Sequence, residues 1–167
     1  MRFHIFNRKF HYWAAGIVVL PALLVFSTGL LLQLKKQVSW VQPAEQRASA
    51  ATPSLSLAAV LESARAAPAA GVQSWDDIER VDLRPAKNLL KITTRSRMEI
   101  QLDAATGAVL QVAPRRSDLI ESLHDGSWFS DGTKLWLFLP TGFALLLLAL
   151  SGFWLFWHQR LFRRRAG

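Results

Sequence analysis

Residues 135–157 read LWLFLPTGFALLLLALSGFWLFW, and this stretch decides how the rest of the chain is interpreted. It contains 23 residues without a charge, and four arginines follow it closely. A helix rises about 1.5 Å per residue, so this stretch would reach about 34 Å, enough to cross a hydrocarbon core of about 30 Å. The sequence therefore predicts a transmembrane helix over residues 135–157.

A second apolar stretch lies near the start of the chain. Residues 12–34 also hold 23 uncharged positions, and they begin with Tyr12 and Trp13, which are typical of a membrane interface. The run is longer than the roughly 7–15 apolar residues of a signal peptide. We therefore predict a retained signal anchor over residues 12–34, preceded by a basic and aromatic tail of residues 1–11.

Both predicted spans contain small residues at which another helix could approach closely. In the first span these residues are Gly16, Ser27, Thr28 and Gly29, and in the second they are Gly142, Ala144, Ser151 and Gly152. Such residues favour packing of the two spans against each other, and also packing in a homodimer or a larger membrane complex.

The positive charge of the chain is concentrated at its two ends. The net charge is +8, and seven basic residues lie in the tails of residues 1–11 and 158–167, which carry no acid. Basic flanks face the cytoplasm, so both termini are expected in the cytoplasm and the middle segment in the periplasm of a bacterial inner membrane. The same distribution argues against nucleic acid as a partner. The lack of cysteine is compatible with an oxidising compartment.

The middle segment predicts a small α+β domain over residues 54–113, entered through a polar connector of residues 35–53. A helix is expected over residues 54–67, with Ser54 as its N-cap, because apolar residues recur there with helical spacing. Period-two alternation then predicts three or four antiparallel strands, within residues 78–83, 90–93, 98–102 and 108–113.

Two further features complete this prediction. Gly107 is expected to supply a positive φ in the turn that begins at Asp103. Residues 114–134 predict an amphipathic helix and a linker back to the membrane. The fold class is thus a membrane protein with two transmembrane helices that flank a small extracytoplasmic α+β domain.

Four segments together resemble the PepSY-associated transmembrane proteins. They are RKFHYWAAG at residues 8–16, LKKQVSWVQP at 34–43, MEIQLDAATGAVLQV at 98–112 and LIESLHDGSWF at 119–129. The resemblance implies that the α+β unit is a PepSY domain. Some larger relatives have four or more spans and reduce iron–siderophore complexes, using b-type haem held between histidines. This chain departs from them in having only two predicted spans.

The histidines are the residues best placed to carry chemistry, and there are four: His4, His11, His124 and His158. In antiparallel spans His11 and His158 would lie at the same cytoplasmic depth, where two rings could hold a haem b between helices. His124 would lie about 50 Å from His158 along a helix, so a haem there would need the His124 of a second copy.

By the resemblance, His11 and His124 are the expected ligands. Each histidine also has a simpler interpretation, as a polar residue at the membrane interface or, for His124, as a helix cap.

Other sequence motifs point away from catalysis by the chain alone. Four acidic residues, Asp76, Asp77, Glu79 and Asp82, are interpreted as a solvated sheet edge rather than a metal site. The sequence contains no glycine-rich phosphate loop and no HExxH or GxSxG motif, so no catalytic residue is predicted.

Three functions are compatible with these observations. The leading hypothesis is an inner-membrane accessory or interaction protein that presents its domain to a periplasmic protein partner and is not an enzyme on its own. The second is a haem b electron-transfer unit, an oxidoreductase component for ferric-siderophore reduction. The third is a module that restrains a secreted peptidase, as PepSY segments of some protease propeptides are thought to do.

Overall fold

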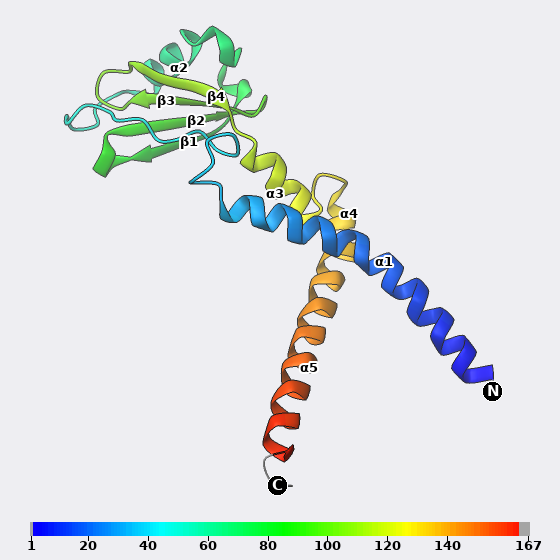
Figure 1. Ribbon diagram of the computed structural model, residues 1–167. Helices are drawn as coiled ribbons and strands as arrows, with labels where there is room; N and C mark the ends of the chain where they lie inside the picture. Colours follow the sequence, from blue (N-terminus) through cyan, green and yellow to red (C-terminus); the bar gives the residue numbers. More distant parts are fainter. Residues whose placement is uncertain (1, 164–167) are drawn as a thin grey trace. The chain divides into compact units, whose positions relative to one another are not determined.

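The computed structural model describes the backbone of residues 2–163, and side chains at positions 16, 18–147, 149, 150, 153 and 157. The chain divides into two compact units. The α+β unit comprises residues 31–120, and the helical unit comprises residues 1–30 and 121–167. Figure 1 shows the elements of each unit.

The α+β unit is built on a four-stranded antiparallel sheet with the strand order β1-β2-β3-β4 (Figure 1). The strands are β1 (Ile78–Arg84), β2 (Leu89–Thr94), β3 (Met98–Asp103) and β4 (Val109–Pro114). Short 3₁₀ turns lie at Pro68–Ala70, Trp75–Asp77 and Pro85–Lys87. The predicted three or four antiparallel strands are therefore confirmed as four.

The hydrophobic core lies between helix α2 (Leu57–Arg65) and one face of the sheet. Val60 and Ala64 point into it from α2, where they are one helical turn apart. The sheet contributes alternate residues of its two central strands, Leu90, Ile92, Ile100 and Leu102. Ser56, and not Ser54, caps the helix, because its hydroxyl accepts a hydrogen bond from the amide of Ala59 at 3.2 Å.

The turn between β3 and β4 has the predicted backbone. Gly107 has a φ of 76°, and its amide donates to the carbonyl of Asp103 at 2.8 Å. The Asp103 carboxylate accepts hydrogen bonds from the amides of Ala105 and Thr106, at 2.9 and 3.0 Å. Any Cβ at position 107 would lie 2.7 Å from the Ser63 hydroxyl oxygen, so only glycine fits both the backbone and the space.

The connector covers the opposite, polar face of the sheet. We call residues 41–49 the strap, because side chains of β3 bind their backbone. Gln101 accepts from the Gln46 amide at 2.8 Å and donates to the Ala44 carbonyl at 3.0 Å. The Ser49 amide donates to Asp103 at 2.7 Å, and hydrogen bonding to Ser49 is the main cause that lowers the pKa of this carboxyl. The sequence predicted this segment only as part of the polar connector of residues 35–53, without these contacts to the sheet.

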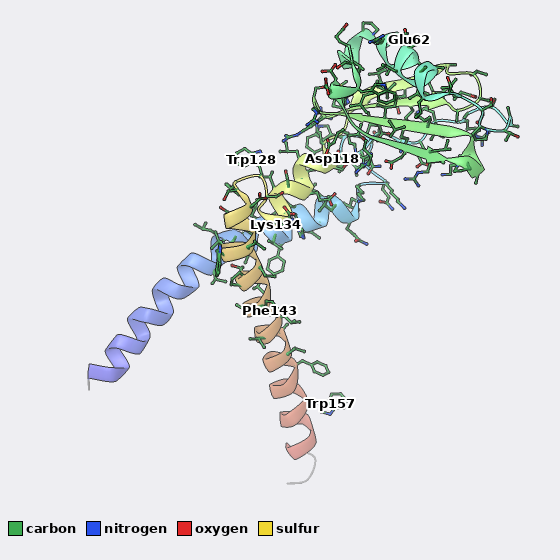
Figure 2. All side chains as sticks on the ribbon, turned by 180° about the vertical axis from the view of Figure 1, so that it is seen from behind. Glu62, Asp118, Trp128, Lys134, Phe143 and Trp157 are labelled. Carbon is green, nitrogen blue, oxygen red and sulfur yellow. The ribbon has the colours of Figure 1, made fainter. Side chains whose placement is uncertain are left out.

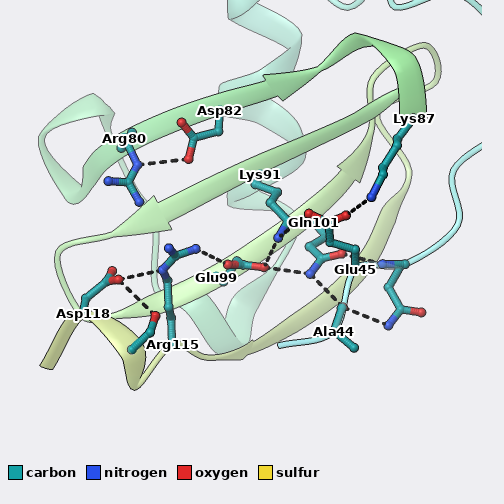
Figure 3. A network of polar contacts seen from close by, with 12 residues as sticks. Ala44, Glu45, Arg80, Asp82, Lys87, Lys91, Glu99, Gln101, Arg115 and Asp118 are labelled. Atoms are coloured by element: carbon teal, nitrogen blue, oxygen red, sulfur yellow. Dashed lines mark hydrogen bonds and ion pairs between the residues drawn. The ribbon is translucent and has the colours of Figure 1, made fainter. Parts of the chain in front are cut away.

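A buried ion network lies beneath the strap (Figure 3). Lys91 lies 3.3 Å from Glu99 and 3.4 Å from Glu45, and Glu99 also pairs with Arg115 at 2.5 Å. Arg115 in turn contacts Asp118 at 2.8 Å, at the start of helix α3 (Ser117–Asp125). The Glu99 side chain is fully buried, so its two cationic partners supply the stabilisation that water would otherwise give.

The helical unit contains α1 (Arg2–Gln33) up to residue 30, the end of α3, the short α4 (Asp131–Thr133) and α5 (Leu139–Arg163). A π-helical turn, η4 (Lys134–Phe138), joins α4 to α5, and the amide of Leu139 donates to the carbonyl of Lys134. Pro140 explains this widened turn, because it has no amide hydrogen and its ring would clash with the carbonyl of Trp136.

Among the residues that the structure describes, no helix combines the length and the apolar character that crossing a bilayer requires.

Candidate functional site

His124 occupies the last turn of α3 and is fixed by residues of α1. Its Nδ1 lies 3.0 Å from the Thr28 hydroxyl and 3.1 Å from the Val25 carbonyl oxygen. A carbonyl only accepts hydrogen bonds, so this arrangement places a hydrogen on Nδ1, and in the neutral ring the lone pair is then on Nε2. The Thr28 hydroxyl donates to the Leu24 carbonyl at 2.6 Å, which leaves its oxygen free to accept from the ring.

Gly29 provides the space for this ring. A Cβ at position 29 would lie 3.3 Å from Cε1 and 3.7 Å from Nδ1 of His124. An alanine would therefore press on the imidazole, and a larger side chain would displace it.

An apolar groove of about 420 Å³ adjoins His124 within the helical unit. Its polar end is formed by His124, Asp125 and Lys134, and its wall includes Phe143 and Leu146 of α5. Figure 2 shows Lys134 at the start of η4 and Phe143 further along the following helix. The groove thus combines an oriented imidazole with an apolar surface, an arrangement that suits a largely apolar ligand.

An ion pair between Lys134 and Asp125 lies at the polar end of the groove. Lys134 donates to Asp125 at 2.6 Å, and the Ser127 amide donates to the same carboxylate at 2.9 Å. Although desolvation by itself raises the pKa of Asp125, these hydrogen bonds outweigh it and lower the pKa to about 2. The same pair raises the pKa of Lys134.

The K134Q variant is expected to raise the pKa of Asp125 toward the ordinary value of about 3.9. Because the folded pKa of about 2 lies below the ordinary one, the ionised pair stabilises the helical unit above about pH 4. That stabilisation is lost as the pH falls toward 2. NMR titration of the Asp125 carboxyl carbon in detergent measures the pKa directly. K36Q, which removes an equal charge elsewhere, should leave it unchanged, and an unchanged value in K134Q would refute the pairing.

The turn after His124 depends on another glycine. Gly126 has a φ of 81°, and a Cβ there would lie 2.4 Å from the ring of Phe138. Phe138 is 8% exposed, and its ring also approaches that of Phe129, with centroids 6.2 Å apart. Gly126 therefore allows the chain to turn directly against the rings of Phe129 and Phe138, and Phe138 lines the groove.

Of the three histidines named as candidate ligands, the structure describes the side chain of His124 alone. His11 and His158 lie in α1 and α5, at positions whose side chains are outside the described residues, as does His4. Their predicted roles stay predictions.

Sequence reasoning missed three residues of this site, Thr28, Gly29 and Lys134. The first two were interpreted as small positions for helix packing, whereas they contact His124. A hydroxyl followed by a glycine inside an apolar stretch was the available signal, because a buried hydroxyl needs a hydrogen-bond partner.

Two members of the acidic cluster have structural partners. Asp77 closes a capping box with Ser74, and hydrogen bonding from the Gln73 amide is the main cause that lowers its pKa. Asp82 pairs with Arg80 at 3.0 Å on the sheet. Neither carboxylate needs a metal ion to account for its position.

The fold is that of a small α+β domain together with a second, helical unit. The family model described as the PepSY-associated TM region matches residues 8–167. The chain therefore belongs to this family, which confirms the resemblance found in its sequence. No curated protein and no solved structure matches the chain.

Proposed function

We propose that this protein is an accessory subunit of the bacterial inner membrane that holds a small interaction domain in the periplasm. One observation carries the proposal: the α+β unit is complete in itself. Helix α2 fills one face of the sheet, and the strap covers the other through bonds to Gln101 and Asp103. Contacts with a periplasmic protein partner are thus left to the outer surface of the unit.

The proposal includes two spans, over residues 12–34 and 135–157, with both termini in the cytoplasm. The basic tails support this orientation. Large apolar side chains on both helices are also exposed, for example Leu20 at 72% on α1 and Leu147 at 64% on α5. Contact with lipid accounts for such exposure, which an aqueous surface would make unfavourable.

The proposal also includes a homodimer or larger complex formed through α5. The space around a Cβ at Gly142 is open within 4 Å in this chain, so a second helix could approach closely there. The chain has no cysteine, so single cysteines report contacts without background.

Oxidative cross-linking in native membranes tests this part of the proposal. Gly142→Cys is expected to give a covalent dimer, whereas Leu147→Cys, about 140° around the helix, is not. Equal cross-linking at both positions, or none at Gly142, would refute a dimer through this face.

A second candidate function, haem b binding, is favoured by the arrangement at His124. A haem-ligating histidine commonly donates Nδ1–H to an oxygen and binds iron through Nε2. His124 donates Nδ1–H to Val25 or Thr28 and adjoins an apolar groove, so the residues fit such a group. A bound b-type haem would supply one-electron transfer. His124 of a second copy, or His11 with His158 at the other rim, would complete the ligand pairs.

A visible spectrum tests the haem proposal. Protein purified in mild detergent from haem-sufficient cells is expected to show a Soret band and, after dithionite reduction, sharp α-bands. H124A should lose the haem assigned to the groove, and H11A should lose the haem assigned to the other rim. H4A serves as the matched control and should keep the full content. A colourless wild-type preparation would refute this function without affecting the accessory role.

A further inference from the structure

A basic cleft lies at the edge of the α+β unit, distinct from the His124 groove. It has a volume of about 340 Å³. Four cationic side chains and one carboxylate line it, and we call this set the basic cleft: Lys35, Lys36, Arg84, Lys87 and Glu45. With four positive charges against one negative charge, its net charge is +3.

The cations of the cleft come from separate segments of the chain. Lys35 and Lys36 follow the end of α1 at Gln33, where a helix terminus attracts positive charge. That effect does not account for Arg84, the last residue of β1, or for Lys87, which ends the next 3₁₀ turn. The fold therefore brings together charges that repel each other unless an anion lies between them.

Glu45 compensates only part of this charge. It pairs with Lys87 and also lies 3.4 Å from the buried Lys91, and hydrogen bonding from Lys87 is the main cause that lowers its pKa. Among the described residues, Lys35, Lys36 and Arg84 form no ion pair. Three cations thus remain available to an external ligand.

Membrane orientation does not explain these charges either. Basic residues next to a span are favoured on its cytoplasmic side. Lysines that follow a span on the periplasmic side are therefore disfavoured. In the proposed topology, Lys35 and Lys36 lie on the outer side, immediately after the first span. The cost of positive charge at this position suggests a binding role.

We propose that the basic cleft binds a phosphate group, with Arg84 as a forked donor and Lys35 and Lys36 as point charges. A planar guanidinium matches two phosphate oxygens at once, and ammonium groups supply charge from flexible stems. The phosphate could belong to an anionic phospholipid at headgroup level or to a free phosphate ion. The lipid source rests on the proposed topology, whereas binding of free phosphate does not.

The first arm of the test uses the full chain in an uncharged detergent, titrated with sodium phosphate and followed by ³¹P and amide NMR. Saturable binding is expected, and R84Q should weaken it about tenfold, the factor that one hydrogen bond to a charged group contributes. K35Q/K36Q should weaken it about 100-fold on the same basis. R97Q is the matched control, because Arg97 lies at the hairpin between β2 and β3, at the other end of the strands.

The second arm uses nanodiscs that contain equal amounts of phosphatidylglycerol and phosphatidylcholine. Native mass spectrometry should show retained phosphatidylglycerol in wild type and R97Q, with a loss in R84Q and K35Q/K36Q, if a lipid is the source. Saturable binding of free phosphate with no lipid preference assigns the site to a soluble ligand, and either result supports the proposal.

Two results would overturn the phosphate site. One is the absence of binding in both arms. The other is an equal loss in R97Q and R84Q, which would mean that only net charge matters. Because the first arm works in detergent, a wrong topology would leave phosphate binding intact, so failure of the accessory role and failure of the site are distinguishable.

Discussion

Replacing Glu99 by glutamine is expected to destabilise the α+β unit by about 3 kcal/mol, the lower end of the range for breaking a buried ion pair. The substitution keeps the shape of the side chain but removes the charge that Lys91 and Arg115 share. The loss stays at the lower end because Lys91 keeps Glu45 at 3.4 Å and Arg115 keeps Asp118 at 2.8 Å. Hydrogen exchange of the β2 and β3 amides in detergent gives the free energy of unfolding.

Two variants show whether the buried charge is the cause. E62Q removes a carboxylate from an exposed pair with Arg65 on α2, and it should cost less than about 0.5 kcal/mol. Adding Lys91→Met to Glu99→Gln should recover at least about 1 kcal/mol, because the buried ammonium that has lost one of its two carboxylate partners is then gone. A loss in E99Q no larger than that in E62Q would contradict the network's role.

The G126A variant is expected to destabilise the helical unit by about 2–5 kcal/mol. A non-glycine residue in the left-handed region costs about 1–2 kcal/mol, and overpacking typically adds about 1–3 kcal/mol. Both apply here, because φ is 81° and the added Cβ would lie 2.4 Å from the Phe138 ring. Exchange protection in residues 126–138 and the thermal midpoint in detergent measure the loss.

A matched glycine and a relief variant accompany this test. G132A adds a Cβ whose nearest neighbour, the Ser130 hydroxyl oxygen, is 3.6 Å away, so its effect should stay within about 0.5 kcal/mol. In the double variant G126A/F138A, the added Cβ no longer meets the Phe138 ring. The loss of stability in the double variant should therefore be smaller than the sum of the losses in the two single variants. If the two single losses of stability simply add in the double variant, the Phe138 ring is not the reason that position 126 requires glycine.

Local pattern was sufficient to predict the sheet and its main turn. Apolar residues alternate in β2 and β3, so Ile92 and Ile100 were assignable to the core before their pairing was known. A positive φ was predicted at Gly107, because the chain has to turn there to enter β4, and the structure has it. The helix was also predicted, although its N-cap is Ser56, because two serines near its start offered the same signal.

The strap could not be predicted, because its contacts are nonlocal and join backbone to side chain. Gln46 meets Gln101, and Ser49 meets Asp103, across more than fifty residues. The buried network has the same origin: Lys91 and Glu99 become neighbours only when the β2–β3 register places Thr93 opposite Glu99. Alternating polar residues indicated a polar face, but their pattern did not show what covers it.

The sequence predicted one residue of the candidate site, His124. It did not predict the residues that contact this histidine. The sequence predicted a histidine near the membrane boundary, whereas its hydrogen bonds to α1 depend on how α1 and α3 pack. The π-helical turn that carries Lys134 and Phe138 into the groove is explained by Pro140, but the apolar pattern of this stretch did not predict a widened turn.

Topology mapping tests whether the α+β domain lies in the periplasm between two spans. Alkaline phosphatase, which is active only outside the cytoplasm, is fused after Ala70 or after Gly167, and both fusions are expressed at matched levels. High activity is expected for the Ala70 fusion and background activity for the Gly167 fusion. Background activity at Ala70 with high activity at Gly167 would contradict it.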